Sequence, residues 1–297
     1  MARLAFKGAL VVGKCEGAYL ERRREGSLKG NQGETLFYWV QDARDARGVC
    51  LMVHGLGEHS GRYAHVAEAL TTAGFVTWGF DLKGHGRSSG ARGHWSNFQE
   101  LTGEVELLLS KIQAEQPDLP TILLGHSLGG LIVLSYALEY DRRLAAVVAS
   151  SPALELSFKP PAFQLFLART LGKVLPALPV QNQLDPKWLS RDPAVGAAYF
   201  SDPLVHRTIT LGAYLSMRQT MEQVKNGAGR LSVPCLVLQA GEDHLVDSKT
   251  SRRFAEALQT AGSYYQEYDR FYHEIFNEAD RQVVFNDLSA WLNARLN

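Results

Sequence analysis

Two stretches of the chain carry the pattern Gly-x-Ser-x-Gly, at residues 86–90 and 125–129. A serine in this pattern can act as a nucleophile when it stands on a sharp bend between a strand and a helix. The apolar run Thr121–Leu124 leads into Ser127, and a buried helix is expected to begin at Leu128. Ser88 instead lies in a polar, glycine-containing stretch. We therefore predict Ser127 as the nucleophile and Ser88 as an ordinary loop residue.

A serine hydroxyl needs a base that removes its proton and an acid that orients this base. When the nucleophile stands on such a bend, the partners follow later in the chain, the acid before the histidine. Of nine histidines, His273 alone follows a predicted strand that comes after the acid loop. Asp243 comes just past an apolar run at 235–239. The sequence thus predicts a triad of Ser127, Asp243 and His273.

Two neighbouring carboxylates compete with Asp243 for the role of the acid. Asp247 directly precedes the next predicted helix, so its side chain is better suited to capping exposed backbone amides. Glu242 is the remaining alternative, and Asp243 is preferred mainly for its place just past the strand.

Attack on a carbonyl also requires backbone amides that stabilise the negatively charged oxygen. One comes from the residue after the nucleophile, here Leu128, and one from a loop after an early strand. The loop His54-Gly55-Leu56-Gly57 follows the apolar run Val49–Val53, and the Leu56 amide is the candidate. The alternative is that this loop is only a glycine turn.

Short apolar runs alternate with longer segments of helical spacing, which is typical of βαβ units. Most runs are continuously apolar, as expected of parallel strands covered on both faces. The predicted strands are Thr35–Val40, as an antiparallel edge, Val49–Val53, Phe75–Phe80, Thr121–Leu124, Ala145–Ala149, Cys235–Gln239 and Tyr264–Tyr268. The predicted helices are Tyr63–Ala73, Phe98–Glu115, Leu128–Tyr140, Ser248–Ala261 and Arg281–Leu296. The expected fold class is α/β, with a mostly parallel central sheet flanked by helices.

One long interval breaks this alternation, between the strand that ends near Ser150 and the strand that begins at Cys235. It is too long for a simple loop, so we expect an inserted helical cap. The predicted organisation is an extension over residues 1–30, a core over 31–152 and 232–297, and a cap over 153–231. Residues 21–33, rich in Arg, Glu and Gly, are expected to run along the surface.

The composition excludes several classes of protein. The 297 residues include 31 Lys plus Arg and 31 Asp plus Glu, so the formal charge is zero and a nucleic-acid partner is not expected. No apolar stretch is long enough for a membrane span, and three widely spaced cysteines fit a reducing compartment. The apolar run Leu4–Val12 resembles an export signal, but Lys7 interrupts it. We expect a cytoplasmic protein. No metal or phosphate-loop motif is present, so no cofactor is expected.

Four motifs together resemble those of the monoacylglycerol lipase and lysophospholipase branch of the α/β-hydrolases. They are His54-Gly-Leu-Gly-Glu-His-Ser-Gly-Arg-Tyr63, Asp81-x-x-Gly-His-Gly-Arg-Ser88, Gly125-His-Ser-Leu-Gly-Gly130 and Gly241-Glu-Asp-His-Leu-Val-Asp247. The resemblance extends into the cap at 189–192 and 199–204.

This resemblance implies the same triad, the Leu56 and Leu128 amides as oxyanion donors, and a substrate that is a single-chain lipid ester. It also implies that Glu58, Arg62 and Tyr199 lie near a polar pocket for the glycerol end. Mammalian-type members carry a second histidine three residues after the catalytic one. Here that position is Phe276, which we also expect at the substrate.

Between Pro161 and Pro176, apolar residues recur at helical spacing beside two cations that are four residues apart. The apolar residues are Phe163, Phe166, Leu167, Leu171, Val174 and Leu175, and the cations are Arg169 and Lys173. The ordinary interpretation is that this face packs on the body of the enzyme or lines an acyl tunnel. The alternative is transient docking on a lipid surface, with the cations at the headgroups.

The sequence therefore predicts a serine hydrolase that cleaves monoacylglycerols through an acyl-enzyme. A lysophospholipase or a broad carboxylesterase is the alternative within the same class. From a different class, a non-catalytic binding protein on a hydrolase scaffold is the remaining alternative.

Overall fold

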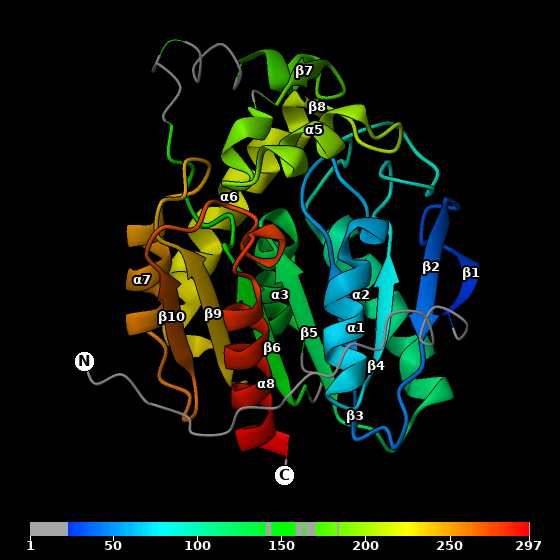
Figure 1. Cartoon of the computed structure of the whole chain (residues 1–297). Coiled ribbons are helices and arrows are strands. Elements are labelled where there is room, and N and C mark those ends of the chain that lie inside the picture. Colours follow the sequence, from blue (N-terminus) through cyan, green and yellow to red (C-terminus); the bar gives the residue numbers. More distant parts are fainter. Residues whose placement is uncertain (1–22, 141–143, 159–162, 164–169, 183, 297) are drawn as a thin grey trace.

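The computed structural model describes residues 23–140, 144–158, 163, 170–182 and 184–296. An eight-stranded sheet forms the centre (Figure 1), in the order β1-β2-β4-β3-β5-β6-β9-β10. In this order, the six strands β4, β3, β5, β6, β9 and β10 pair in parallel, whereas β1 and β2 are antiparallel to their neighbours. The α/β fold with a mostly parallel sheet is therefore confirmed. The strands are β1 (Arg23–Lys29), β2 (Thr35–Gln41), β3 (Gly48–Val53), β4 (Phe75–Phe80), β5 (Thr121–His126), β6 (Ala146–Ser150), β9 (Cys235–Ala240) and β10 (Tyr264–Tyr268).

Both faces of the sheet are covered by helices, which explains why the central strands are apolar throughout. Along β3, Val49, Leu51 and Val53 belong to one apolar cluster, and Cys50 and Met52 belong to the other. Residues of α1 and α8 complete the second cluster, and residues of α2, α3 and α7 complete the first. The helices are α1 (Ala64–Thr72), α2 (Gln99–Glu115), α3 (Leu128–Glu139), α7 (Ser248–Glu256) and α8 (Gln282–Leu296).

The helices follow the predicted segments, with two differences at their ends. A 3₁₀ turn, η2 (Ser60–Tyr63), precedes α1. Helix α7 ends at Glu256, five residues before the predicted end at Ala261. The chain turns away there, because the Thr260 hydroxyl donates to the Leu231 carbonyl and Gly262 adopts a left-handed φ of 88°.

Strand β1 was not among the predicted strands. Residues 21–33 were expected to run along the surface, within an extension over residues 1–30. Instead Arg23–Lys29 pairs with β2 over its whole length, from Arg23 opposite Gln41 to Lys29 opposite Thr35. The side chains of this edge strand are mostly exposed or half-buried, so they show no apolar periodicity. Residues 1–22 lie outside the described residues.

The chain between β6 and β9 forms a separate layer. Its elements are β7 (Pro179–Gln181), η3 (Pro186–Trp188), α5 (Pro193–Ser201), β8 (Thr208–Thr210), α6 (Leu211–Gly227) and η4 (Ala228–Arg230). β7 and β8 pair as a second, two-stranded sheet, which the expectation of a helical cap did not include. Figure 1 shows α5, β7 and β8 above the end of the central sheet where β5 leads into α3.

Helix α6 connects this layer to the core, since Met217 and Met221 belong to the same apolar cluster as α3. We propose residues 153–231 as the cap and residues 31–152 and 232–297, extended by β1, as the core. Among the described residues, no helix is both long and apolar enough to cross a bilayer.

Candidate active site

Ser127 stands alone between the end of β5 at His126 and the start of α3 at Leu128. Its φ of 55° and ψ of −114° lie in a region that residues with a side chain rarely adopt. The Ser127 amide donates to the Ser150 carbonyl at 2.9 Å, and its carbonyl accepts from the Ala153 amide at 3.0 Å. The surrounding backbone thus holds the strained bend in place, as is typical of a nucleophile on a strand-to-helix turn.

The glycine at position 129 is required by the close packing of this bend. A Cβ atom at Gly129 would lie 2.0 Å from the Val53 carbonyl oxygen. The start of α3 therefore approaches the end of β3, and this approach brings the loop after β3 close to Ser127. A Cβ atom at Gly55 would lie only 3.4 Å from Ser127 Cβ.

His273 and Asp243 meet as predicted from their places after β10 and β9. His273 Nδ1 lies 2.8 Å from Asp243 Oδ2, and both side chains are buried. Asp243 Oδ1 accepts from the amides of Leu245 and Val246 at 2.9 and 3.0 Å. These bonds fix the carboxylate, so that it can hold the imidazole with a proton on Nδ1 and leave Nε2 as the basic atom.

The surroundings of the two histidines at the site have opposite effects on their pKa values. Burial disfavours the charged form of His273, but the Asp243 carboxylate raises the pKa above its ordinary value of 6.5. Burial and the nearby His273 lower the pKa of His126 to about 4. The centroids of the two rings are 4.8 Å apart, and His126 directly precedes Ser127. At a pH at which His273 can take a proton, His126 thus stays neutral.

The two competing carboxylates have other positions. Asp247 caps α7, because its side chain accepts from the Thr250 amide at 3.2 Å, as predicted. The Glu242 side chain is exposed, and its backbone amide donates to the Phe271 carbonyl. Neither carboxylate contacts His273 among the described hydrogen bonds.

The two candidate oxyanion donors flank Ser127. Leu128 is the first residue of α3, so its amide has no acceptor within the helix. Leu56 lies between Gly55, which approaches Ser127, and Gly57, which has a left-handed φ of 80°. A Cβ atom at Gly57 would lie 2.3 Å from the His206 carbonyl oxygen of the cap. The loop is therefore packed between Ser127 and the cap.

Arg62 lies between two buried carboxylates next to this loop. It contacts Glu58 Oε2 at 2.5 Å and the two Glu274 oxygens at 2.6 and 2.8 Å. Burial would raise the pKa of Glu58, but Arg62 lowers it to about 2. The Arg62 guanidinium also lies over the Tyr199 ring, 4.9 Å from its centroid. Glu58, Arg62 and Tyr199 thus lie together with Glu274, and the two carboxylates face a single guanidinium.

Phe276 is a correction to the predicted substrate-binding set. Its ring is buried in the apolar cluster beneath α8 and stacks on Phe285, with the ring centroids 5.9 Å apart. The neighbouring residue Glu274 occupies the site instead. The sequence could have indicated it, since Glu274 directly follows the predicted base His273.

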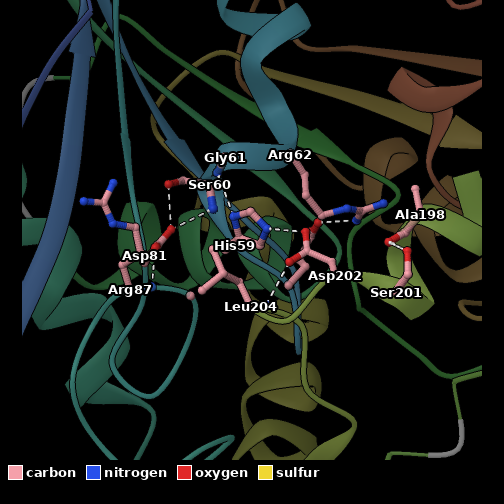
Figure 2. A network of polar contacts seen from close by, with 12 residues as sticks. His59, Ser60, Gly61, Arg62, Asp81, Arg87, Ala198, Ser201, Asp202 and Leu204 are labelled. Carbon is pink, nitrogen blue, oxygen red and sulfur yellow. Dashed lines mark hydrogen bonds and ion pairs between the residues drawn. The ribbon is translucent and has the colours of Figure 1, made fainter.

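A second polar network joins the cap to the loop after β3 (Figure 2). His59 Nε2 lies 2.9 Å from Asp202 Oδ2, and His59 Nδ1 accepts from the Gly61 amide. Next to it, Asp81 Oδ1 accepts from the Ser60 amide and hydroxyl at 2.8 and 2.6 Å. Asp202 belongs to the stretch 199–204 that resembles related caps, but the sequence did not show its contact with His59, because the two residues are distant along the chain.

Ser88, the serine of the other motif, is part of the scaffold. Its hydroxyl accepts from the Phe37 amide at 2.9 Å and donates to the Asp81 carbonyl. Only 7% of the residue is exposed. Ser88 therefore ties the loop after β4 to β2.

The cap exposes large apolar side chains, namely Phe158, Phe163, Val174, Leu175, Leu178 and Phe200. Of the predicted amphipathic face, Leu171 is half-buried and Lys173 is exposed. Phe166, Leu167 and Arg169 lie outside the described residues. Within the described part of the chain, no cluster of His, Cys, Asp and Glu could hold a metal ion.

Comparisons with known proteins support the motif analysis. The family model Hydrolase_4, described as serine aminopeptidase S33, matches residues 44–280. The chain belongs to this family. It is 36% identical to the "Monoacylglycerol lipase" of Mycolicibacterium smegmatis over 92% of this chain and 98% of that protein. It is 32% identical to the "Phospholipase YtpA" of Bacillus subtilis over 85% of this chain and 98% of that protein.

A solved structure, the Paleococcus ferrophilus monoacylglycerol lipase, matches with a TM-score of 0.81 and 38% identity. The match covers 88% of this chain and 99% of that chain. The α/β-hydrolase fold and membership among the ester-hydrolysing members of the family, both expected from the motifs, are thus confirmed.

Proposed function

We propose that this protein is a serine hydrolase that cleaves the ester of monoacylglycerols to a free fatty acid and glycerol. The main structural support is the strained bend at Ser127 together with the buried pair of His273 and Asp243. The similarity to monoacylglycerol lipases over most of the chain supports the substrate class.

In the proposed mechanism, Ser127 attacks the ester carbonyl while His273 takes its proton through Nε2. The amides of Leu56 and Leu128 stabilise the charged oxygen of the tetrahedral intermediate. His273 then protonates the departing glycerol oxygen, and an acyl-enzyme remains on Ser127. A water molecule, activated by His273, attacks the acyl-enzyme and releases the fatty acid. Asp243 keeps the imidazole oriented and stabilises its charged form.

The charges beside His273 favour a neutral headgroup. Arg62 is a cation of the proposed glycerol pocket, and Glu58 and Glu274 already bind it. A phosphate group would have to compete with these carboxylates for the guanidinium and would meet a surplus negative charge. Glycerol hydroxyls meet no such repulsion, which supports a monoacylglycerol over an anionic lysophospholipid.

A lysophospholipase is the second candidate, favoured by the similarity to the Bacillus subtilis phospholipase. A comparison of kcat/KM for monooleoylglycerol, lysophosphatidylcholine and lysophosphatidic acid separates the two. We expect monooleoylglycerol to be cleaved with the highest kcat/KM and the anionic lysophosphatidic acid with the lowest. Faster cleavage of both lysophospholipids would overturn the proposed substrate. A p-nitrophenyl ester serves as the control for an intact catalytic centre.

We further propose that the cap contacts lipid surfaces transiently. The side chains proposed for this contact are Phe163, Val174 and Phe200, which expose 72%, 75% and 68% of their surfaces. Burying a methylene group is worth about 0.8 kcal/mol, so apolar cap residues can help draw a chain out of a membrane. Co-sedimentation with phosphatidylcholine vesicles should decrease in a Val174→Ser, Phe200→Ser variant. Unchanged sedimentation of this variant would contradict the proposal.

A further inference from the structure

Helix α5 and its two flanks, residues 188–206, contact the three loops to which we assign the acid, the base and the Leu56 oxyanion donor. We call this segment the cap clamp. At its first end, the Trp188 ring lies tilted against the His244 ring, with centroids 3.7 Å apart, and packs edge-on against Tyr272. His244 directly follows the proposed acid, and Tyr272 directly precedes the proposed base. The Trp188 side chain thus contacts the residue next to the proposed acid and the residue next to the proposed base.

Backbone and charged contacts fix the same end of the clamp to the His273 loop. The Glu274 amide donates to the Leu189 carbonyl at 2.7 Å. Arg191 donates to the buried Glu278 carboxylate through its backbone amide and through Nε, at 3.3 and 3.1 Å. Glu278 also accepts from the Tyr272 amide at 2.7 Å. The loop that carries His273 therefore shares a buried acceptor with the clamp.

The other end of the clamp is bonded to the loop that carries the Leu56 amide. The His206 amide donates to the Gly57 carbonyl at 2.8 Å. Asp202 Oδ2 binds His59 Nε2, and Asp202 Oδ1 accepts from the Leu204 amide at 2.8 Å (Figure 2). Because His59 Nδ1 accepts from the Gly61 amide, the ring is the neutral tautomer that donates to Asp202 through Nε2.

The middle of the clamp lies against the ion cluster that joins the two loops. Arg62 binds Glu58 next to the oxyanion loop and Glu274 next to His273, and Arg62 stacks on Tyr199 of α5. The oxyanion loop and the His273 loop are thus linked through the two ends of the clamp and through Arg62 at its centre. A displacement of α5 would change the distance between the oxyanion donor and the base.

We propose that the cap clamp sets the relative position of the oxyanion loop and the His273 loop, with Arg191 and Asp202 as positioning residues at its two ends. The inference rests on the proposed function, because it assumes that the Leu56 amide and His273 act on one substrate. Misplacing catalytic groups by about 1 Å can reduce the rate about 100-fold, so loosening either end should reduce kcat. Substrate affinity should change little.

The two ends of α5 offer a sharp test. The nine residues of α5 span about 13 Å at a rise of about 1.5 Å each, and Arg191 and Asp202 lie beyond its two ends. At such a separation the effects of two mutations usually add. If the clamp acts as one body, Arg191→Ala and Asp202→Ala should each lower kcat about tenfold with KM within about twofold. The double variant should then lose little more than either single variant.

The assay uses the full chain and p-nitrophenyl butyrate, at temperatures well below each variant's unfolding midpoint. Arg191→Lys and Asp202→Asn should recover part of the lost kcat. Ser201→Ala is the matched control, since among the described residues its hydroxyl bonds only to the carbonyls of Ala197 and Ala198 in the same helix. Figure 2 shows Ser201 beside Ala198. It should keep the wild-type kcat.

Unchanged kcat in the single variants, or a double variant whose loss equals the product of the single losses, would overturn the clamp. So would a rise in KM with kcat unchanged. These results are distinct from a failure of the proposed function, in which the wild-type protein itself would show no turnover that depends on Ser127.

Discussion

The two Gly-x-Ser-x-Gly stretches of this chain have the same pattern and opposite surroundings. Ser127 has a left-handed φ of 55° and only partial burial, on a bend between a strand and a helix. Ser88 is buried, and its hydroxyl both accepts and donates a hydrogen bond within the scaffold. The motif alone therefore does not identify a nucleophile. Our proposal of Ser127 rests on its strained position, together with a histidine and a carboxylate brought in by later strands.

The largest difference between the two serines should appear in turnover. Ser127→Ala removes the atom that forms the acyl-enzyme and should lower kcat on monooleoylglycerol on the order of a millionfold. Ser88→Ala should keep nearly all activity, since the Ser88 hydroxyl is engaged with Phe37 and Asp81. Equal losses in the two variants would remove the distinction between the motifs.

The partners of Ser127 allow a second contrast, between two adjacent carboxylates. Asp243→Asn should lower kcat about 10⁴-fold, because an amide in place of Oδ2 no longer holds the imidazole with its proton on Nδ1. Glu242→Gln, in the exposed neighbour, should leave kcat within about twofold. If Glu242→Gln were the more damaging change, the acid would be wrongly assigned.

The pH profile tests the base of this site. His273 must be neutral to accept the serine proton, and Asp243 raises its pKa above 6.5. The acidic limb of kcat/KM should thus have its midpoint above pH 6.5 and fall tenfold per pH unit below it. In Asp243→Asn, the strongest influence that raises the pKa of His273 is lost while burial still lowers it, so the residual activity should have its midpoint at lower pH. If the acidic limb of Asp243→Asn kept the wild-type midpoint, a group other than His273 would control the pH dependence.

The free energy of unfolding should change the least of all these properties. Here Ser88→Ala should have the larger effect and Ser127→Ala the smaller one, which is the reverse of the order expected for turnover. Ser88→Ala leaves the buried Phe37 amide without its acceptor and should lower the free energy of unfolding by about 1–3 kcal/mol. Ser127→Ala keeps the strained backbone and removes a partly exposed hydroxyl, so we expect a change below about 0.5 kcal/mol. Urea unfolding of both variants measures this. A larger loss of stability in Ser127→Ala would mean that its hydroxyl has a structural role.

The core of the fold could be predicted because each central strand is a continuous apolar run. In a parallel sheet the carboxyl ends of the strands lie along one edge, so the loops carrying Ser127, Asp243 and His273 could be expected at the same place. The Asp247 cap could be predicted as well, because it depends only on the residues that follow it. These features are local in sequence or follow from strand order.

The parts that the sequence did not reveal depend on contacts between distant segments. The edge strand β1 has mostly exposed side chains and no apolar pattern. The role of Glu274 depends on Arg62, which comes from another loop, and Asp202 depends on His59. The resemblance to mammalian-type lipases placed Phe276 at the substrate, but its ring turns into the core beside Phe285. A matching position in a motif does not show which way a different side chain points.

The most direct test of the nucleophile is to locate the adduct of a fluorophosphonate probe on the folded protein. Trypsin cleaves after Arg87 and Arg92 and after Lys111 and Arg142, so Ser88 and Ser127 fall in separate peptides, 88–92 and 112–142. Mass spectrometry should find one adduct per chain, on Ser127 in peptide 112–142, and none in the Ser127→Ala variant. An adduct on peptide 88–92, or an active protein that carries no adduct, would contradict the assignment of Ser127.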